Sequence, residues 1–147
     1  MMLYFAYGSN MEKEQMNSRC PHCKFITVAR LDHYTLAFTR YSDRWSGGVA
    51  DLLPSRGKSV HGVLYEISFT DLKLLDQYTG YPHCYLRGDV LLETSSGERL
   101  PAMTYFAVRQ GEVKPSRRYL DQILKGARSY HFPKDYIHFL KSIETQG

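Results

Sequence analysis

The residues near the N-terminus that are best suited to chemistry lie in one short loop, Tyr7-Gly8-Ser9-Asn10. Glycine lets a backbone approach a ligand closely, and serine and asparagine add short polar side chains. The apolar, β-forming run Met2–Ala6 predicts a short buried strand that leads into the loop. Ser9 and Glu12 have the spacing of a capping box, which predicts a helix over residues 11–19 directly afterwards.

This order of strand, loop and helix decides what kind of ligand the loop could take. Free backbone N–H groups at the start of a helix favour an anion. The loop lacks the glycine spacing of a nucleotide-phosphate fingerprint, so a small carboxylate is a better candidate than a dinucleotide. An ordinary β–α turn with a capping box would contain the same residues, and on the local sequence alone it is the favoured alternative.

The cysteines offer two other kinds of site. Cys20-Pro21-His22-Cys23 has the spacing of a thiol redox motif, but it follows a predicted helix and precedes a strand, so no helix start lowers the thiol pKa. A zinc site would need a second ligand pair, and the adjacent His83-Cys84 is poorly spaced for one. We therefore expect reduced cysteines, no metal and no cofactor.

Length and composition limit the number of domains, the partners and the cellular location that can be expected for this chain. The chain has 147 residues, 43% of them apolar, and a formal net charge of +4. This length fits one hydrophobic core, so we expect a single domain over residues 1–147. No run of five or six like charges occurs, and no apolar stretch reaches the length of a membrane span, so neither a nucleic acid nor a membrane is expected as a partner. Three cysteines without a secretory signal favour the cytoplasm.

The elements that must position the loop alternate between strands and helices. Helical patterns follow Ser116, a predicted N-cap, and Pro133, and a shorter one covers residues 71–78 before Gly80. The β-like patterns beyond the loop cover residues 24–40, 49–53, 60–67, 85–93 and 99–107. The predicted fold is α+β, with a mixed, barrel-like sheet and flanking helices.

Several ordered blocks of this chain resemble the γ-glutamylcyclotransferase family. The first is the opening run, Tyr4-Phe5-Ala6-Tyr7-Gly8-Ser9-Asn10-Met11. The likeness continues in Trp45-Ser46-Gly47-Gly48-Val49-Ala50, Val60-His61-Gly62-Val63-Leu64-Tyr65-Glu66, Leu75-Asp76-Gln77-Tyr78-Thr79-Gly80, and Pro115-Ser116-Arg117-Arg118-Tyr119-Leu120 with Gly126-Ala127. The resemblance implies a γ-glutamylcyclotransferase-like fold and a small γ-glutamyl compound as the ligand.

The resemblance also implies a reaction and the residues that support it. The α-amine of a γ-glutamyl compound attacks its own γ-carbonyl, which yields 5-oxoproline and releases the attached amine. Tyr7, Gly8, Ser9 and Asn10 would then hold the glutamyl group. Further pocket phenols are expected at Tyr105 and Tyr119, with Tyr85 as a third candidate, although each could instead be a core or rim residue.

The catalytic position departs from the family pattern. The family has a glutamate immediately before the glycine that ends the short helix, and this chain has Thr79 there. A threonine hydroxyl is too weakly basic to take a proton from an ammonium group at neutral pH. Asp76 and Glu66 lie nearby in sequence, but both match ordinary family positions and neither is an evident substitute. Two alternatives follow: a cyclotransferase whose base is unidentified, or a catalytically silent protein that binds a γ-glutamyl or other small carboxylate ligand. The leaving amine and the oligomeric state stay open.

Overall fold

The computed structural model describes residues 2–146, and its centre is a closed five-stranded barrel. The strands are β1 (Met2–Ala6), β2 (Lys24–Ser42), β3 (Gly47–Ile67), β4 (Tyr85–Thr94) and β5 (Arg99–Ala107). They follow one another around the barrel in the order β1-β3-β2-β4-β5, and β1 closes it by pairing in parallel with β5. The other pairings are antiparallel, so the prediction of a mixed, barrel-like sheet is confirmed.

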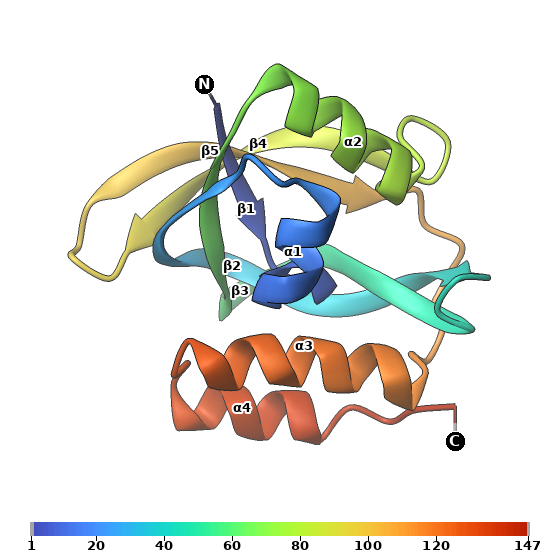
Figure 1. Cartoon of the computed structure of the whole chain (residues 1–147). Coiled ribbons are helices and arrows are strands. Elements are labelled where there is room, and N and C mark those ends of the chain that lie inside the picture. The colour runs from blue at the N-terminus through green and yellow to red at the C-terminus, as the bar shows by residue number, and fades with distance from the viewer. Residues whose placement is uncertain (1, 147) are drawn as a thin grey trace.

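Four α-helices flank the barrel (Figure 1): α1 (Lys13–Arg19), α2 (Phe69–Thr79), α3 (Arg117–Ser129) and α4 (Lys134–Lys141). In Figure 1, α3 and α4 pack together below the barrel, whereas α2 crosses its opposite side. The apolar face of α3 is buried, and Ser116 caps this helix as predicted, with its hydroxyl accepting the N–H of Tyr119. Within the described residues, no helix is long and apolar enough to cross a membrane.

The central strands are longer than predicted. Residues 49–53 and 60–67, expected as two strands, belong to the single strand β3, which pairs with β2 along most of its length. The register shifts at three places, between Phe25 and Thr27, between Asp32 and Tyr34, and between Phe38 and Arg40. Such bulges bend a strand and increase its twist. At the second shift, residues 55–58 of β3 have no partner in β2, and the pairing resumes at Ser59, so β3 continues as one curved strand.

The helix after the loop is interrupted, and the predicted capping box at Ser9 is wrong. Ser9–Met11 form a 3₁₀ turn, and α1 begins only at Lys13. Its N-cap is Glu12, whose carboxylate accepts the N–H groups of Glu14 and Gln15 at 3.0 Å each. A side-chain oxygen that accepts the free N–H groups of the first turn caps a helix. Because Glu12 has this role, the Ser9 hydroxyl is left for another partner.

Two smaller differences concern α2 and α4. α2 starts at Phe69, two residues earlier than expected, because Ser68 and Asp71 form a reciprocal capping box. Its C-terminus is at Gly80, as predicted, and this glycine adopts the left-handed conformation with φ of 82°. Pro133 is the N-cap of α4 rather than a residue of its first turn.

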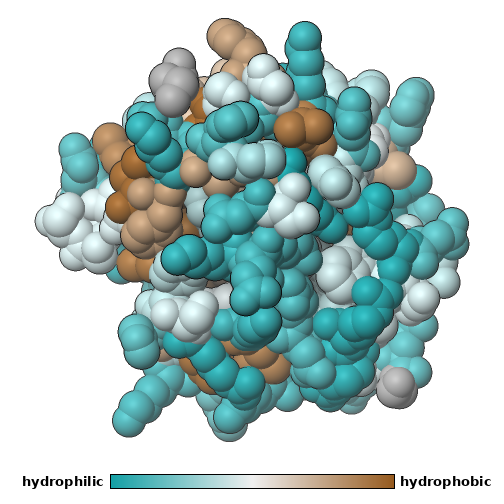
Figure 2. Space-filling model, in the orientation of Figure 1, coloured by the Kyte–Doolittle hydropathy of each residue, from teal (hydrophilic) through white to brown (hydrophobic). Residues whose placement is uncertain are grey.

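The core fills the barrel and the interface with α3, and the exterior is mostly polar. The fully buried side chains include Phe5, Leu52, Leu64, Leu120 and Ile123, which come from β1, β3 and α3. The face shown in Figure 2 is predominantly hydrophilic, with hydrophobic side chains gathered at its left side and top. The packing of α3 against the barrel therefore fixes the side of the molecule from which Tyr119 approaches the N-terminal loop.

Candidate functional site

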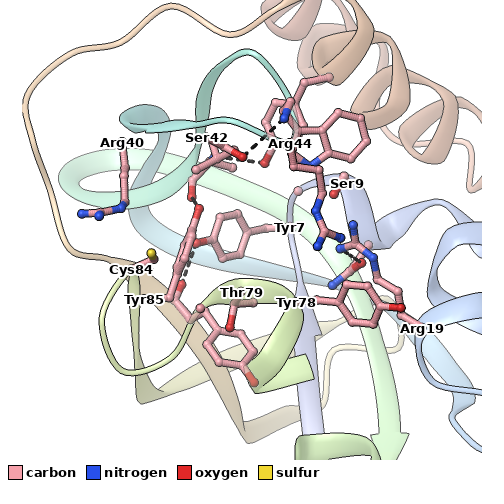
Figure 3. A pocket seen from close by; sticks show the side chains of 18 of the residues that line it. Tyr7, Ser9, Arg19, Arg40, Ser42, Arg44, Tyr78, Thr79, Cys84 and Tyr85 are labelled. Atoms are coloured by element: carbon pink, nitrogen blue, oxygen red, sulfur yellow. Dashed lines mark hydrogen bonds between the residues drawn. The ribbon is translucent and has the colours of Figure 1, made fainter. Parts of the chain in front are cut away.

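A cavity of about 360 Å³ opens beside the end of β1. Its walls come from the loop after β1, the turn between β2 and β3, the end of α2, and the starts of β4 and α3 (Figure 3). All the site residues proposed from the sequence line it: Tyr7, Gly8, Ser9, Asn10, Thr79, Tyr85, Tyr105 and Tyr119. The fold thus brings together residues that are up to 112 positions apart in the chain, and their roles toward a ligand stay predictions.

The loop is held from behind by side chains of α1. The side-chain nitrogen Nε2 of Gln15 donates to Ser9 Oγ at 2.8 Å and to Asn10 Oδ1 at 3.0 Å. Arg19 also donates to Asn10 Oδ1, at 3.1 Å, and the side-chain nitrogen Nδ2 of Asn10 donates to the hydroxyl of Tyr4 at 3.1 Å. Both polar atoms of the Asn10 side chain are therefore engaged within the protein, and this side chain shapes the loop.

The backbone of the loop is left available to a ligand. Among residues 2–146, no backbone or side-chain acceptor takes the N–H groups of Gly8, Ser9 and Asn10. A Cβ at Gly8 would lie 3.3 Å from both the Ala50 Cβ and the Tyr119 hydroxyl. Glycine thus allows close approach between the loop and the opposite wall.

Two phenols bind the backbone of one residue of β3, Ala50, on the far wall. The hydroxyl of Tyr119 accepts the N–H of Ala50 at 3.0 Å, and the hydroxyl of Tyr85 donates to the carbonyl of the same residue. Tyr7 donates to the carbonyl of Tyr105 at 2.6 Å. The Tyr119 oxygen is the acceptor in its contact with Ala50. Its own hydrogen has no acceptor among the described residues, so it can be donated into the cavity.

Burial keeps these phenols neutral. It raises the pKa of Tyr7, Tyr85 and Tyr119 well above the ordinary value of 10.0, and nearby Asp51 adds to the rise at Tyr7 and Tyr85. Burial likewise raises the pKa of Tyr4 to about 12. At neutral pH these side chains are hydrogen-bond donors or acceptors and not bases.

A buried carboxylate, Asp51, supports the wall behind the phenols. Its Oδ1 accepts the N–H groups of Leu52 at 2.8 Å and of Ala107 at 3.0 Å. Its Oδ2 accepts from Thr39 at 3.0 Å and from the Arg109 guanidinium at 2.6 Å. With four donors around it and no exposed surface, Asp51 joins β2, β3 and β5 and is not free to take part in chemistry.

Three arginines bring positive charge to the cavity. The guanidinium groups of Arg19 and Arg44 lie over the ring of Tyr78, at 4.6 and 5.1 Å from its centroid, and Arg40 lies across the cavity (Figure 3). Burial and the neighbouring Arg44 lower the pKa of Arg19. None of the three forms a salt bridge within residues 2–146. An anionic group of a ligand would supply the missing charge.

These arginines, as well as Gln15 and Tyr78, were not predicted from the sequence as residues of the site. Arg19 lies in the last turn of α1, and Arg44 in the turn between β2 and β3. A weak signal existed, because α1 follows the loop directly and its long side chains can reach back. Arg44 gives no such local signal, since only the folding of β2 against β3 brings it near α1.

Thr79 lines the cavity at the C-terminal end of α2. Its hydroxyl donates to the carbonyl of Asp76 at 3.2 Å, an acceptor that also takes the N–H of Gly80 at 2.9 Å. The Asp76 carboxylate accepts the hydroxyl of Tyr105 at 2.6 Å. Glu66, on β3, is not among the lining residues.

The cysteines lie apart from this chemistry, except for Cys84. Burial, together with nearby Asp71, raises the pKa of Cys20 to about 12, so its thiol stays protonated. Cys20, Cys23 and Cys84 are unpaired, and Cys84 lines the cavity beside Gly80. In the described part of the chain, no group of three or more His, Cys, Asp or Glu side chains could hold a metal ion.

Comparisons with known proteins agree on one family. The family described as "Gamma-glutamyl cyclotransferase, AIG2-like" matches residues 4–132, which include every residue that lines the cavity. "Gamma-glutamylcyclotransferase" of Mus musculus and that of Homo sapiens are each 33% identical to this chain, over 97% of its length and 78% of theirs. A solved structure described as "Gamma-glutamyl cyclotransferase" has a TM-score of 0.93 at 33% identity, covering 99% of this chain and 89% of its own. YkqA from Bacillus subtilis has a TM-score of 0.79 at 26% identity, covering 98% of this chain and 55% of its own.

Proposed function

Because the chain belongs to the γ-glutamylcyclotransferase family, we propose that it cyclises the glutamyl group of a small γ-glutamyl compound to 5-oxoproline and releases the attached amine. The observation that supports this most is the convergence of the loop over residues 7–10 and the Tyr119 hydroxyl on one cavity of about 360 Å³. Cavities of this volume suit small molecules.

The reaction needs folding of the substrate, one proton acceptor and one donor. The α-nitrogen forms a bond to the γ-carbonyl carbon, and the bond from that carbon to the leaving nitrogen breaks. The α-nitrogen begins as an ammonium group and ends as a lactam N–H, so it loses one proton before the attack and a second after it. The leaving nitrogen gains both protons and ends as an ammonium ion. Both reacting atoms belong to the same molecule, so a pocket that holds the chain in a bent form supplies much of the rate acceleration.

The polar groups of the cavity fit these requirements. The unpaired N–H groups of Gly8, Ser9 and Asn10 are suited to the glutamyl carboxylate, because backbone donors bind anions well. The free hydrogen of Tyr119 is suited to the γ-carbonyl oxygen, where negative charge develops as the amine attacks. In this assignment Tyr7 and Tyr85 position the walls, since their hydroxyl groups already donate to backbone carbonyls.

The arginines indicate the chemistry of the leaving amine. Arg19 and Arg44 lie at one side of the cavity without a carboxylate partner among the described residues. A carboxylate on the released amine, as in a γ-glutamyl amino acid, would be attracted to this side. A γ-glutamyl compound whose amine carries no negative charge would lack that interaction.

The direct test is 5-oxoproline release by the purified protein from paired substrates, γ-glutamyl-alanine and γ-glutamyl-ethylamine. We expect release from both, with a lower KM for the alanine compound. No release from either, although both bind in calorimetry, would disprove cyclisation and support the second candidate, a binding protein without catalytic activity. The observation that favours this second candidate is Thr79, at the position where the family resemblance predicts a glutamate.

A further inference from the structure

Cyclisation raises one question that the lining of the cavity does not answer directly, namely which group takes the proton from the α-ammonium. Asp43 is the one carboxylate residue that lines the cavity in the described chain, and it lies in the exposed turn between β2 and β3. Asp51 is occupied by four donors, and Glu66 lies outside the cavity. The remaining candidate is a carboxylate that lies outside the cavity and is hydrogen-bonded to a residue of its lining.

Tyr105 connects the cavity to such a carboxylate. Its side chain lines the cavity and is only 3% exposed, and its hydroxyl donates to Asp76 Oδ1 at 2.6 Å. This distance is usual for a hydroxyl bonded to a carboxylate, a class of hydrogen bond that is shorter and stronger than one between neutral groups. The nearest cation to Asp76 is Arg87, whose Nε is 3.9 Å from the same oxygen and belongs to a partly exposed side chain.

The position of Asp76 is well fixed. Its carbonyl accepts the N–H groups of Gly80 and Tyr81 at 2.9 and 3.0 Å and the hydroxyl of Thr79 at 3.2 Å. The end of α2 is thereby tied to the residues that follow it. Tyr105 is held from β5, where the Tyr7 hydroxyl donates to its carbonyl at 2.6 Å. The hydrogen bond between Tyr105 and Asp76 thus joins β5 to α2, and both of its ends are held in place.

Resting on the proposed function, we propose that Tyr105 and Asp76 together accept the proton of the substrate ammonium, with Tyr105 as the catalytic residue and Asp76 as the group that acts through it. As the Tyr105 oxygen takes a proton from the nitrogen, its own proton moves to Asp76 Oδ1. The nitrogen keeps the freed electron pair and attacks the γ-carbonyl carbon. The proton on Asp76 returns along the same path to the leaving nitrogen, and the amine is expelled. The α-nitrogen then gives up its second proton, which passes by way of Tyr105 and Asp76 to the released amine, so that protons and charge balance over the cycle.

The neutrality of Tyr105 agrees with this route. Burial, and then its hydrogen bond to Asp76, raise the pKa of Tyr105 far above the ordinary value. A phenolate at this position is therefore disfavoured, and a phenol that gains one proton while it loses another never becomes one. The carboxylate, not the phenol, carries the proton between the two steps.

The test compares Asp76→Asn and Tyr105→Phe with the wild-type protein, with Glu66→Gln as a matched carboxylate-to-amide control outside the cavity. We expect kcat for γ-glutamyl-alanine to fall about 10²-fold in each of the first two variants, the low end for a general base, and the double variant to be no slower. Binding of the substrate, measured by calorimetry, should change little, and Glu66→Gln should keep wild-type kcat.

A second set of variants separates proton transfer from a structural role. Thr79→Glu is added to Asp76→Asn and, separately, to Tyr105→Phe, because it provides a carboxylate that faces the cavity without the relay. If the relay is correct, the added glutamate restores kcat in both backgrounds. If Asp76 only shapes the site, the added glutamate does not restore it.

The outcomes distinguish the relay from the proposed function. An active wild-type protein whose kcat is unaffected by Asp76→Asn or by Tyr105→Phe would overturn the relay alone. A wild-type protein that binds γ-glutamyl-alanine and releases no 5-oxoproline would overturn the relay together with the proposed function. Thermal melting of each variant checks folding, and if Asp76→Asn does not fold, the Tyr105→Phe pair with and without Thr79→Glu decides.

Discussion

Arg19 and Arg44 share one aromatic ring, because their guanidinium carbons lie 4.6 and 5.1 Å from the centroid of Tyr78. Two like charges so close to each other repel, and a guanidinium over a ring gains only part of that energy back. The arrangement is most favourable with an anion between or beside them. The pair comes from α1 and from the β2–β3 turn, so it exists only in the folded chain.

We expect Arg44→Gln to raise KM for γ-glutamyl-alanine about fivefold, since an exposed ion pair contributes up to about 1 kcal/mol. KM for γ-glutamyl-ethylamine should stay unchanged, because this compound has no carboxylate on its leaving amine. Steady-state kinetics at low salt give both values. Arg117→Gln is the matched control, since Arg117 is an exposed residue that pairs with Asp121 away from the cavity. An equal rise for both substrates would contradict recognition of the leaving amine.

Substitution of Thr79 tests how far the end of α2 limits turnover. Thr79→Ala should change kcat by about twofold or less, because the threonine hydroxyl is used within the helix end and is a poor base. Thr79→Glu should raise kcat about tenfold, less than the 10²–10⁴-fold worth of a general base, because Asp76 already provides a slower route. Thr79→Gln is the control, because glutamine has the size of glutamate without its charge. A Thr79→Gln protein as fast as Thr79→Glu would show that the carboxylate is not the cause.

The buried phenols predict a loss of stability in alkali. Burial raises the pKa of Tyr4 from 10.0 in the unfolded chain to about 12 in the folded protein. The contribution of Tyr4 to the free energy of unfolding is therefore complete below pH 10 and is lost as the pH rises through 12. Between these values the free energy of unfolding should fall by about 1.4 kcal/mol per pH unit for this tyrosine. Urea unfolding at pH 9, 10 and 11 measures the slope, which should be shallower in Tyr4→Phe, and equal slopes would contradict the assignment.

Glu12 should contribute to stability as the cap of α1. We expect Glu12→Ala to lower the free energy of unfolding by about 1 kcal/mol at pH 7, the usual worth of an N-cap. Burial alone would raise the pKa of Glu12, but the N–H groups of Glu14 and Gln15 lower it together with Lys125 and Gln122, so the folded-state pKa lies below 4.5. The cap is thus fully present above pH 4.5 and is lost as the pH falls through the folded-state pKa. Denaturant unfolding at pH 7 and pH 3 should show a smaller difference between the two proteins at pH 3.

Local sequence patterns predicted most of the elements, whereas Tyr105, Tyr119 and Thr79 were expected in the cavity only because of the family resemblance. The boundaries of β1, β5 and the N-cap Ser116 follow from apolar runs and capping chemistry, which depend on neighbouring residues. The continuity of β3 could not be predicted in this way, because it depends on pairing with β2 on both sides of residues 55–58. The capping box at Ser9 failed for a related reason, since Gln15 competes for the serine hydroxyl and Glu12 takes over the cap.

The partners of the cavity residues required the whole fold. The hydrogen bond between Tyr105 and Asp76 joins β5 to α2, and the two hydrogen bonds with Ala50 join α3 and β4 to β3. Each of these contacts spans at least 29 positions, which no periodic pattern records. The sequence could therefore propose which phenols face a cavity, but not which of them has a hydrogen left to donate.

The closure of the barrel by β1 has a consequence for the timing of folding. β1 pairs with residues 63–67 of β3 and, through Tyr4, with Met103 of β5. Although β1 is the first strand in the chain, it is therefore among the last to pair with both of its neighbours. Contacts this distant in sequence slow folding, because the intervening chain must be ordered first. The ligand loop continues directly from β1 and cannot take its final shape earlier. Amide hydrogen exchange at Phe5 and Ala6 should consequently report the opening of the entire barrel, and the cavity should persist as long as the fold itself does.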